Sequence, residues 1–315
     1  MTDLPTIKRE DGLWMLRRMR LIRQASERIA ALYPSNVMET PVHLCIGQEA
    51  VSVGVCRHLR DEDKMFLGHR THGPALAKGL PLRKLMAELY GRTTGCSHAH
   101  GGSMHLLDLE HGLPGSSAIV GGSIALGVGA ALAARLMGSA SVGVSYFGDA
   151  ATNAGVFWES LNFAALRKLP VLFVCEDNGL SNVMPFAAHS SHDVVGPVAS
   201  FMPVLRADGT DVLSVHEQAG VAVQRLRSGS GPVFLHCKTK RWMKHQGPEA
   251  CDLAENHVDR GRDCPIEKLE AFLLHSRIAR PTELAQIERE VEQEVDAAIA
   301  FAEASPFPQP EPVEA

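Results

Sequence analysis

The sequence lacks the features that define several common classes of protein. Lys and Arg do not outnumber Asp and Glu, and the net charge over 315 residues is -5, with a pI near 6.3. Without a broad basic face, binding to nucleic acid or to an anionic membrane is not expected. The seven cysteines form no CxxC pair, which favours reduced thiols in the cytoplasm over a disulfide framework. No apolar segment before a small-residue cleavage site marks a secretory signal.

What the sequence does contain is enough apolar residues for a large core. Hydrophobic residues make up 45% of the chain and no long polar tract interrupts them, so we expect one large α/β domain, or at most two. A single domain is predicted over residues 12–305, with flexible termini at 1–11 and 306–315. Residues 12–32 have the spacing of an amphipathic helix with a basic outer face, and the last predicted helix, after Pro281, has an acidic one.

The stretch 146–181 carries the strongest structural signal. Two β-branched and aromatic runs, 142–147 and 171–174, predict strands, and apolar residues at helical spacing between them predict a crossover helix. The first strand leads into Asp149 and the second into Asn178, 29 positions later, which is about the length that such a crossover needs. The two side chains should therefore lie side by side at the carboxyl edge of a parallel sheet, where such sheets bind ligands.

Asp149 and Asn178 offer oxygen ligands that suit a hard cation. A carboxylate and an amide oxygen favour Mg²⁺ or Ca²⁺ and leave positions open for phosphate oxygens. The small residues at 150–155 open the predicted helix, and their free backbone N–H groups would meet an anion. A turn at Gly179 would let the Leu180 carbonyl complete the metal shell, although the same residues also suit an ordinary tight turn.

Five motifs that occur in order along the chain add a more specific signal. They are HLCIGQEAVSVGV at 43–55, HRTHG at 69–73, GGSMHL at 101–106, ESLNFAALRKLPVLFVCEDN at 159–178 and FAEASPFP at 301–308. Together they resemble the alpha subunit of the thiamine diphosphate-dependent 2-oxo acid dehydrogenases, over nearly the whole chain. The resemblance implies a three-layer thiamine diphosphate-binding fold, which is an α/β architecture with a mostly parallel sheet flanked by helices.

The resemblance also implies roles for individual residues. Three histidines become candidate catalytic residues: His43, His72 and His245. The candidate cofactor-binding residues are His69, Arg70, Ala118, Val120, Gly148, Asp149, Ala150, Ala151, Asn178, Leu180 and His245. The candidate ligands of Mg²⁺ are Asp149, Asn178 and Leu180. Within these sets Arg70 is expected to contact the diphosphate with its planar fork, and Val120 to hold the cofactor in its bent form.

The implied activity is that of an oxidoreductase acting on the oxo group of its donor. The chain would decarboxylate a small 2-oxo acid such as pyruvate, or cleave acetoin, and pass the acyl group to a lipoyl acyltransferase. A separate beta subunit would supply the glutamate that activates the cofactor, which implies an α2β2 heterotetramer. Two alternatives stay open. One is a carboligase or transferase subunit without a lipoyl partner, and the other is a non-catalytic cofactor-binding subunit, suggested by Ala150 and Lys244 at positions where relatives have glycine.

Two further stretches raise alternatives of their own. Residues 96–105 contain one Cys and three His, but their spacing matches no familiar zinc module, and a mobile glycine-rich loop without a metal is predicted. The apolar stretch 115–137 is long enough to suggest a transmembrane helix as an alternative. Its glycines and Arg135 instead favour a loop followed by a buried helix that packs behind the cofactor.

Overall fold

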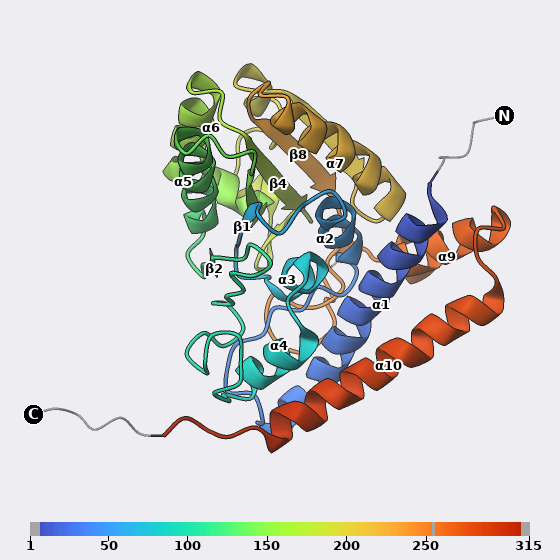
Figure 1. Cartoon of the computed structure of the whole chain (residues 1–315). Coiled ribbons are helices and arrows are strands. Elements are labelled where there is room, and N and C mark those ends of the chain that lie inside the picture. The colour runs from blue at the N-terminus through green and yellow to red at the C-terminus, as the bar shows by residue number, and fades with distance from the viewer. Residues whose placement is uncertain (1–6, 254–255, 310–315) are drawn as a thin grey trace, which may run out of the picture.

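Parallel strands form the centre of the computed structural model, which describes residues 7–253 and 256–309 (Figure 1). The strands are β1 (Lys64–Leu67), β2 (Gly115–Ser116), β3 (Gly143–Gly148), β4 (Val171–Asp177), β7 (Val204–Asp208) and β8 (Val233–Lys238). They form one sheet in the order β2-β1-β3-β4-β8-β7, and every neighbouring pair is parallel. A short antiparallel hairpin follows β4 and consists of β5 (Leu180–Ser181) and β6 (Met184–Pro185). The predicted parallel sheet is confirmed.

Helices cover both faces of this sheet (Figure 1). One face carries α5 (Gly122–Leu136) and α6 (Gly155–Leu166). The other carries α2 (Glu49–Cys56), α3 (His72–Lys78) and α7 (Val212–Arg227). Outside this second layer lie α1 (Arg9–Leu32), α4 (Leu82–Leu89), α9 (Pro265–His275) and α10 (Pro281–Ala304). The short helical segments are α8 (Arg260–Asp263), η1 (Tyr33–Ser35), η2 (Asp149–Asn153), η3 (Phe186–Ala188) and η4 (Val198–Ser200).

The two central strands are buried on both faces, which explains why their sequences are almost continuously apolar. Side chains alternate between the two faces along each strand. Tyr146 and Leu172 therefore pack into the core beneath α2 and α7, whereas Phe147 and Phe173 pack into the core beneath α5 and α6. Helix α6 connects β3 to β4, as predicted for the crossover. This unit places the polar residues after β3 and β4 at one edge of the sheet.

The first and last long helices pack against each other, with ion pairs on and around them. Helix α1 begins at Arg9, within the N-terminal stretch that was expected to be loosely held. Ion pairs join Arg17 to Glu294 (2.5 Å), Arg20 to Glu270 (2.7 Å) and Arg28 to Asp296 (2.7 Å). The sequence predicts a basic outer face on α1 and an acidic outer face on α10. The structure pairs some of these charges with each other, whereas Glu290 and Glu292 of α10 remain exposed.

Helix α5 is more exposed than its apolar sequence predicts. Ile124 and Ala131 pack against the sheet, but Leu126 is 46% exposed and Leu136 is 78% exposed. The neighbouring α6 leaves Leu166 74% exposed. The expectation of a buried helix was therefore wrong for the outer side of α5. Within the described ranges no helix is both long enough and apolar enough to span a bilayer.

Candidate active site

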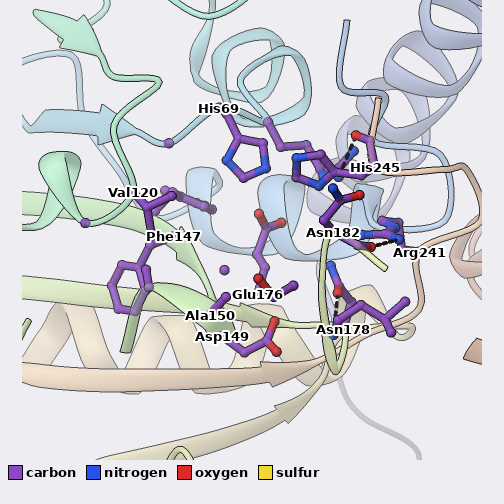
Figure 2. A pocket seen from close by; sticks show the side chains of 18 of the residues that line it. His69, Val120, Phe147, Asp149, Ala150, Glu176, Asn178, Asn182, Arg241 and His245 are labelled. Atoms are coloured by element: carbon purple, nitrogen blue, oxygen red, sulfur yellow. Dashed lines mark hydrogen bonds between the residues drawn. The ribbon is translucent and has the colours of Figure 1, made fainter. Parts of the chain in front are cut away.

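A pocket opens at the carboxyl ends of the central strands, and most of the predicted site residues line it (Figure 2). Those that do so are His69, Arg70, Val120, Gly148, Asp149, Ala150, Ala151, Asn178, Leu180 and His245. They come from segments far apart in the sequence, namely the loops after β1, β3, β4 and β8 and the loop before α5. The parallel sheet brings these loops together, because all of its strands end at the same edge.

Asp149 stands directly after β3 and begins the short helix η2. The pairing of Gly148 with Glu176 in the β3–β4 ladder places this residue beside the end of β4. Its side chain is buried, and its Oδ2 atom has no hydrogen-bond partner among the described residues. Burial, and then the nearby charge of Asp177, raise the pKa of Asp149 to about 7. A buried carboxylate oxygen without a partner is costly, so the site fits a cation.

Asn178 lies on the other side of this position, in the turn after β4. Its Nδ2 donates to Gln48 Oε1 at 3.2 Å, and its Oδ1 accepts from the Leu180 backbone N–H at 3.1 Å. Gly179 supports the turn with a φ of 77°, a value that favours glycine. The turn holds the Asn178 oxygen and Leu180 at the pocket, which agrees with the predicted oxygen donor set.

Asp177 precedes Asn178 at the end of β4, and its carboxylate has partners of its own. Its Oδ2 accepts from His236 Nε2 at 2.7 Å and from Lys238 Nζ at 2.9 Å. Its Oδ1 accepts from the Gly179 backbone N–H at 3.0 Å. Burial alone would raise the pKa of Asp177, but the bonds from His236 and Lys238 outweigh burial and lower it. The carboxylate of Asp177 therefore supports the turn after β4, and its charge is largely compensated.

Three histidine rings cluster on one wall of the site. The ring centroid of His43 lies 4.8 Å from that of His69 and 4.9 Å from that of His245, and those of His69 and His245 are 5.0 Å apart. Burial, and then the charge of Arg70, lower the pKa values of His43, His69 and His245 to about 3, 2 and 4. All three imidazoles are thus neutral at pH 7. Their ring nitrogens lie within 4.8 Å of one another, but the neighbouring guanidiniums oppose a cation there.

Three of the predicted residues do not line the pocket, namely His43, His72 and Ala118. His72 is buried beside it in α3, where its Nε2 lies 2.8 Å from the Ser103 hydroxyl. Burial, and then Arg70, lower the pKa of His72 to about 4. Ala118 lies just before Ile119 and Val120, which do line the pocket. His72 and Ala118 therefore lie next to residues that line the pocket, and the ring of His43 packs edge-on against those of His69 and His245.

The sequence matches the family model described as "Dehydrogenase E1 component" over residues 17–311. The chain belongs to the dehydrogenase E1 family. It is 38% identical over 311 residues to the alpha subunit of acetoin:2,6-dichlorophenolindophenol oxidoreductase from Bacillus subtilis, covering 96% of this chain and 92% of the relative. It is also 38% identical over 329 residues to the alpha subunit of the pyruvate dehydrogenase E1 component from Zymomonas mobilis, covering 98% of this chain and 90% of the relative.

A mitochondrial relative gives a similar result. The somatic form of the pyruvate dehydrogenase E1 alpha subunit from Pan troglodytes is 36% identical over 308 residues, which covers 96% of this chain and 78% of the relative. The resemblance inferred from the five motifs is thereby confirmed. The E1 family implies the use of thiamine diphosphate, and the donor set around Asp149 and the buried arginines are compatible with a cofactor that carries a metal-bound diphosphate.

Three residues of this E1 site were missed from the sequence. Glu176 projects into the middle of the pocket (Figure 2), and its pKa is raised to about 7 by burial, against the opposing charge of Arg70. Its position among the polar residues at the carboxyl end of β4 could have identified it as a site residue. Gln48 and Arg241 also line the pocket. Gln48 lies within the motif at 43–55, but no role was assigned to it, and Arg241 lies in a loop with several other basic residues.

The glycine-rich loop near the site is anchored, although it was predicted to be mobile. The buried carboxylate of Glu88 in α4 accepts four backbone N–H groups from this loop. The donors are Ser97 (2.8 Å), Ala99 (3.1 Å), Gly101 (2.8 Å) and Gly102 (3.0 Å). A carboxylate that satisfies several buried donors rigidifies the segment that carries them. The loop is therefore a fixed support for Ser103, which holds His72.

Proposed function

We propose that this chain is the alpha subunit of a thiamine diphosphate-dependent 2-oxo acid dehydrogenase. It acts on a small 2-oxo acid such as pyruvate, or on acetoin, and its acyl product goes to a lipoyl acyltransferase. The observation that carries the proposal is the buried, unpartnered oxygen of Asp149 beside Asn178, at one edge of a pocket that also contains two buried arginines. Residues 12–305 form one domain in this proposal, and the compartment is the cytoplasm.

Each part of the pocket has a role in this proposal. Asp149, Asn178 and the Leu180 carbonyl hold Mg²⁺, because these are hard oxygen donors. Arg70 neutralises the diphosphate, and the backbone of 148–151 lies against it. Val120 packs against the ring system and fixes its orientation. Bound thiamine diphosphate supplies the nucleophilic carbon and the electron sink for decarboxylation.

The histidines act on the substrate. His69 and His245 line the pocket as neutral rings, so each can donate a hydrogen bond or take a proton at an oxygen of the substrate. His43 packs edge-on against both rings and fixes their orientation. His43 is buried and His69 and His245 are half-buried, so this wall is only partly shielded from water in the isolated chain.

A partner completes the pocket. Ile119 is 73% exposed and Val120 is 60% exposed although both line it, so this wall is open to water in the isolated chain. A beta subunit that covers this wall closes the site and supplies the activating glutamate, in a heterotetramer of two alpha and two beta chains. The three relatives named above as alpha subunits support a partner of this kind.

The proposal is tested by calorimetric titration of thiamine diphosphate with Mg²⁺. The titration uses this chain alone, this chain co-expressed with its beta subunit, and both samples with Asp149→Ala. We expect tight binding in the co-expressed sample and its loss with Asp149→Ala, because the cation loses its carboxylate ligand. Asp61→Ala removes an exposed carboxylate far from the pocket in the fold and should leave binding unchanged. Absence of binding in the co-expressed wild-type sample would contradict the cofactor assignment.

A further inference from the structure

Arg241 is the largest fully buried side chain in the described part of the chain, and it reaches the pocket from the loop after β8 (Figure 2). A guanidinium stays charged at every physiological pH, so its burial requires either a counter-charge or a full set of hydrogen-bond acceptors. The role of this side chain is not covered by the residues assigned above. The contacts of the Arg241 side chain therefore indicate its function.

Among the described residues, Arg241 bonds two backbone carbonyls and the Cys251 sulfur, the last from Nη2 at 4.0 Å, and no carboxylate. Its Nε donates to the Met243 carbonyl at 3.1 Å, and its Nη2 donates to the Asn182 carbonyl at 2.6 Å. The third nitrogen, Nη1, makes no hydrogen bond within the described ranges, and no carboxylate there forms an ion pair with the guanidinium. Arg241 thus brings one full positive charge and one free donor to the pocket.

These two bonds join loops that carry other site residues. Asn182 lies in the turn between β5 and β6, directly after Asn178 and Leu180. Met243 lies two positions before His245. Arg241 therefore ties the loop that offers metal ligands to the loop that offers a histidine, across the mouth of the pocket.

The charges around the pocket favour an anion with more than one negative charge. Burial, and in smaller part the positive charge of Arg241, lower the pKa of Arg70, so the two guanidiniums repel each other. Glu176 is the carboxylate that projects between Val120 and Arg241 in Figure 2. Asp149 also lines the pocket, but the proposed function assigns its carboxylate to Mg²⁺, so the guanidiniums of Arg70 and Arg241 are left for a polyvalent anion.

We propose that Arg241 is a second diphosphate-binding arginine, which couples anion binding to the order of the β5–β6 hairpin. The inference rests on the proposed function, because that function supplies the diphosphate. Nη1 of Arg241 donates to a phosphate oxygen, while Nε and Nη2 keep their bonds to Met243 and Asn182. An anion on Nη1 fixes the guanidinium, and the fixed guanidinium holds the hairpin that presents Leu180.

The test compares three ligands on the co-expressed alpha and beta chains. Thiamine diphosphate, inorganic pyrophosphate and unphosphorylated thiamine are titrated into wild type, Arg241→Lys and Arg241→Gln in the presence of Mg²⁺. We expect Arg241→Gln to lower the affinity for both phosphorylated ligands by about 100-fold. Arg241→Lys should lower it by about 10-fold, because lysine keeps the positive charge but lacks the planar guanidinium that donates several hydrogen bonds. Binding of thiamine should not change. The KM for the cofactor should rise by a larger factor than kcat falls.

Hydrogen exchange supplies a second readout. In the wild type, pyrophosphate should slow exchange of the backbone amides around 180–186, and Arg241→Gln should remove this protection. The matched control is Arg227→Gln, which removes a half-buried arginine bound to the buried Asp63, far from the pocket in the fold. Arg227→Gln should lower the stability of the fold without changing the affinity for either phosphorylated ligand.

The outcomes separate this inference from the proposed function. If the wild type does not bind thiamine diphosphate, the proposed function itself fails. If the wild type binds and Arg241→Gln binds as tightly, only the role of Arg241 fails. An equal loss of thiamine and thiamine diphosphate would also overturn the inference, because it would mean that Arg241 acts on the fold and not on the charged group. If Arg241→Gln does not fold, Arg241→Lys carries the same comparison.

Discussion

The two helical layers of this protein are completed in different ways. The layer that contains α2 and α3 is covered from outside by α1, with α9 and α10 packed against α1 in turn (Figure 1). The layer formed by α5 and α6 has no second layer of described helices over it, and it leaves Leu136 and Leu166 mostly exposed. The first layer is thus closed by the chain itself, through apolar packing and ion pairs. The second presents apolar surface to the surroundings.

The difference indicates which face of the molecule is an interface. Contiguous exposed apolar side chains on a folded chain commonly mark a protein–protein contact. The exposed surface of α5 begins next to Ile119 and Val120, which form the open wall of the pocket. The proposed beta subunit would therefore cover α5 and close the pocket with the same surface. The following predictions test this contrast, from the largest expected effect to the smallest.

Breaking a buried ion pair on the covered side should have the largest effect. Arg23 in α1 bonds Glu49 of α2 through Nε at 2.5 Å and Nη2 at 3.1 Å, and the Glu49 side chain is fully buried. Arg23→Met leaves this carboxylate without its counter-charge, which should lower the free energy of unfolding by about 3–5 kcal/mol. Urea unfolding measures the change. A loss below about 1 kcal/mol would mean that the covered layer does not depend on this contact.

A charge on the exposed side should disrupt assembly and spare the fold. Leu136→Asp in α5 places a carboxylate where the proposed partner buries a leucine, so association with the beta subunit should weaken by about 100-fold. Sedimentation of the co-expressed chains over a dilution series measures this. Val221→Asp is the matched control, because Val221 is an exposed apolar residue on α7 at the opposite face. Equal effects of Leu136→Asp and Val221→Asp would refute the assignment of the interface.

Acid should weaken the covered layer at a defined contact. The His58 and His216 rings stack at 4.3 Å, and His58 Nε2 lies 2.8 Å from the His216 carbonyl. Burial, and then the His216 charge, lower the pKa of His58 to about 4. A lowered histidine pKa gives stability that is present above the unfolded pKa near 6.5 and is lost as the pH falls toward 4.

His58→Gln keeps a donor at this position and removes the titration. The loss of unfolding free energy between pH 7.5 and pH 5 should therefore be smaller in this variant, by about 1 kcal/mol after allowance for the partial exposure of the ring. Thermal or urea unfolding at the two pH values checks this. An unchanged pH dependence would place the acid sensitivity elsewhere, for example in the histidine cluster of the pocket.

An exposed ion pair on the covered side should matter least. Arg17 and Glu294 form a pair whose two side chains are each about one-third exposed. Solvent screens such a pair, so Arg17→Met should lower the free energy of unfolding by less than about 1 kcal/mol. The same urea titration that measures Arg23→Met provides this value. A loss equal to that of Arg23→Met would show that burial does not separate the two contacts.

The sheet and half of the site could be predicted because their signals are local. The apolar runs before Asp149 and Asn178, and the spacing between them, indicate adjacent parallel strands with polar tips. The structure brings Asp149, Asn178 and Leu180 to one pocket, as expected. Arg70 and His245 followed from motifs that lie at strand ends. Their roles in binding and chemistry stay predictions until the titrations above are made.

The parts that sequence reasoning missed depend on contacts between distant segments. Whether α1 exposes its arginines depends on α10, more than 250 positions away, so a basic stripe alone cannot tell a solvated face from a paired one. The apolar sequence of α5 predicts burial within the chain's own fold, but it fits burial against a partner subunit equally well. Arg241 looked like one basic residue among several, because its acceptor at Asn182 lies in another loop.

The uncovered outer side of α5 and α6 also sets a condition on how the protein is made. An alpha chain that folds before a partner is at hand carries an apolar surface in contact with water, and such surfaces promote aggregation. A cell that synthesises more alpha chains than beta chains would accumulate alpha chains without a partner. Chaperones and proteases would have to bind or degrade these unassembled chains. Balanced production of the two chains is therefore a consequence of how α5 is exposed, and not only of catalysis.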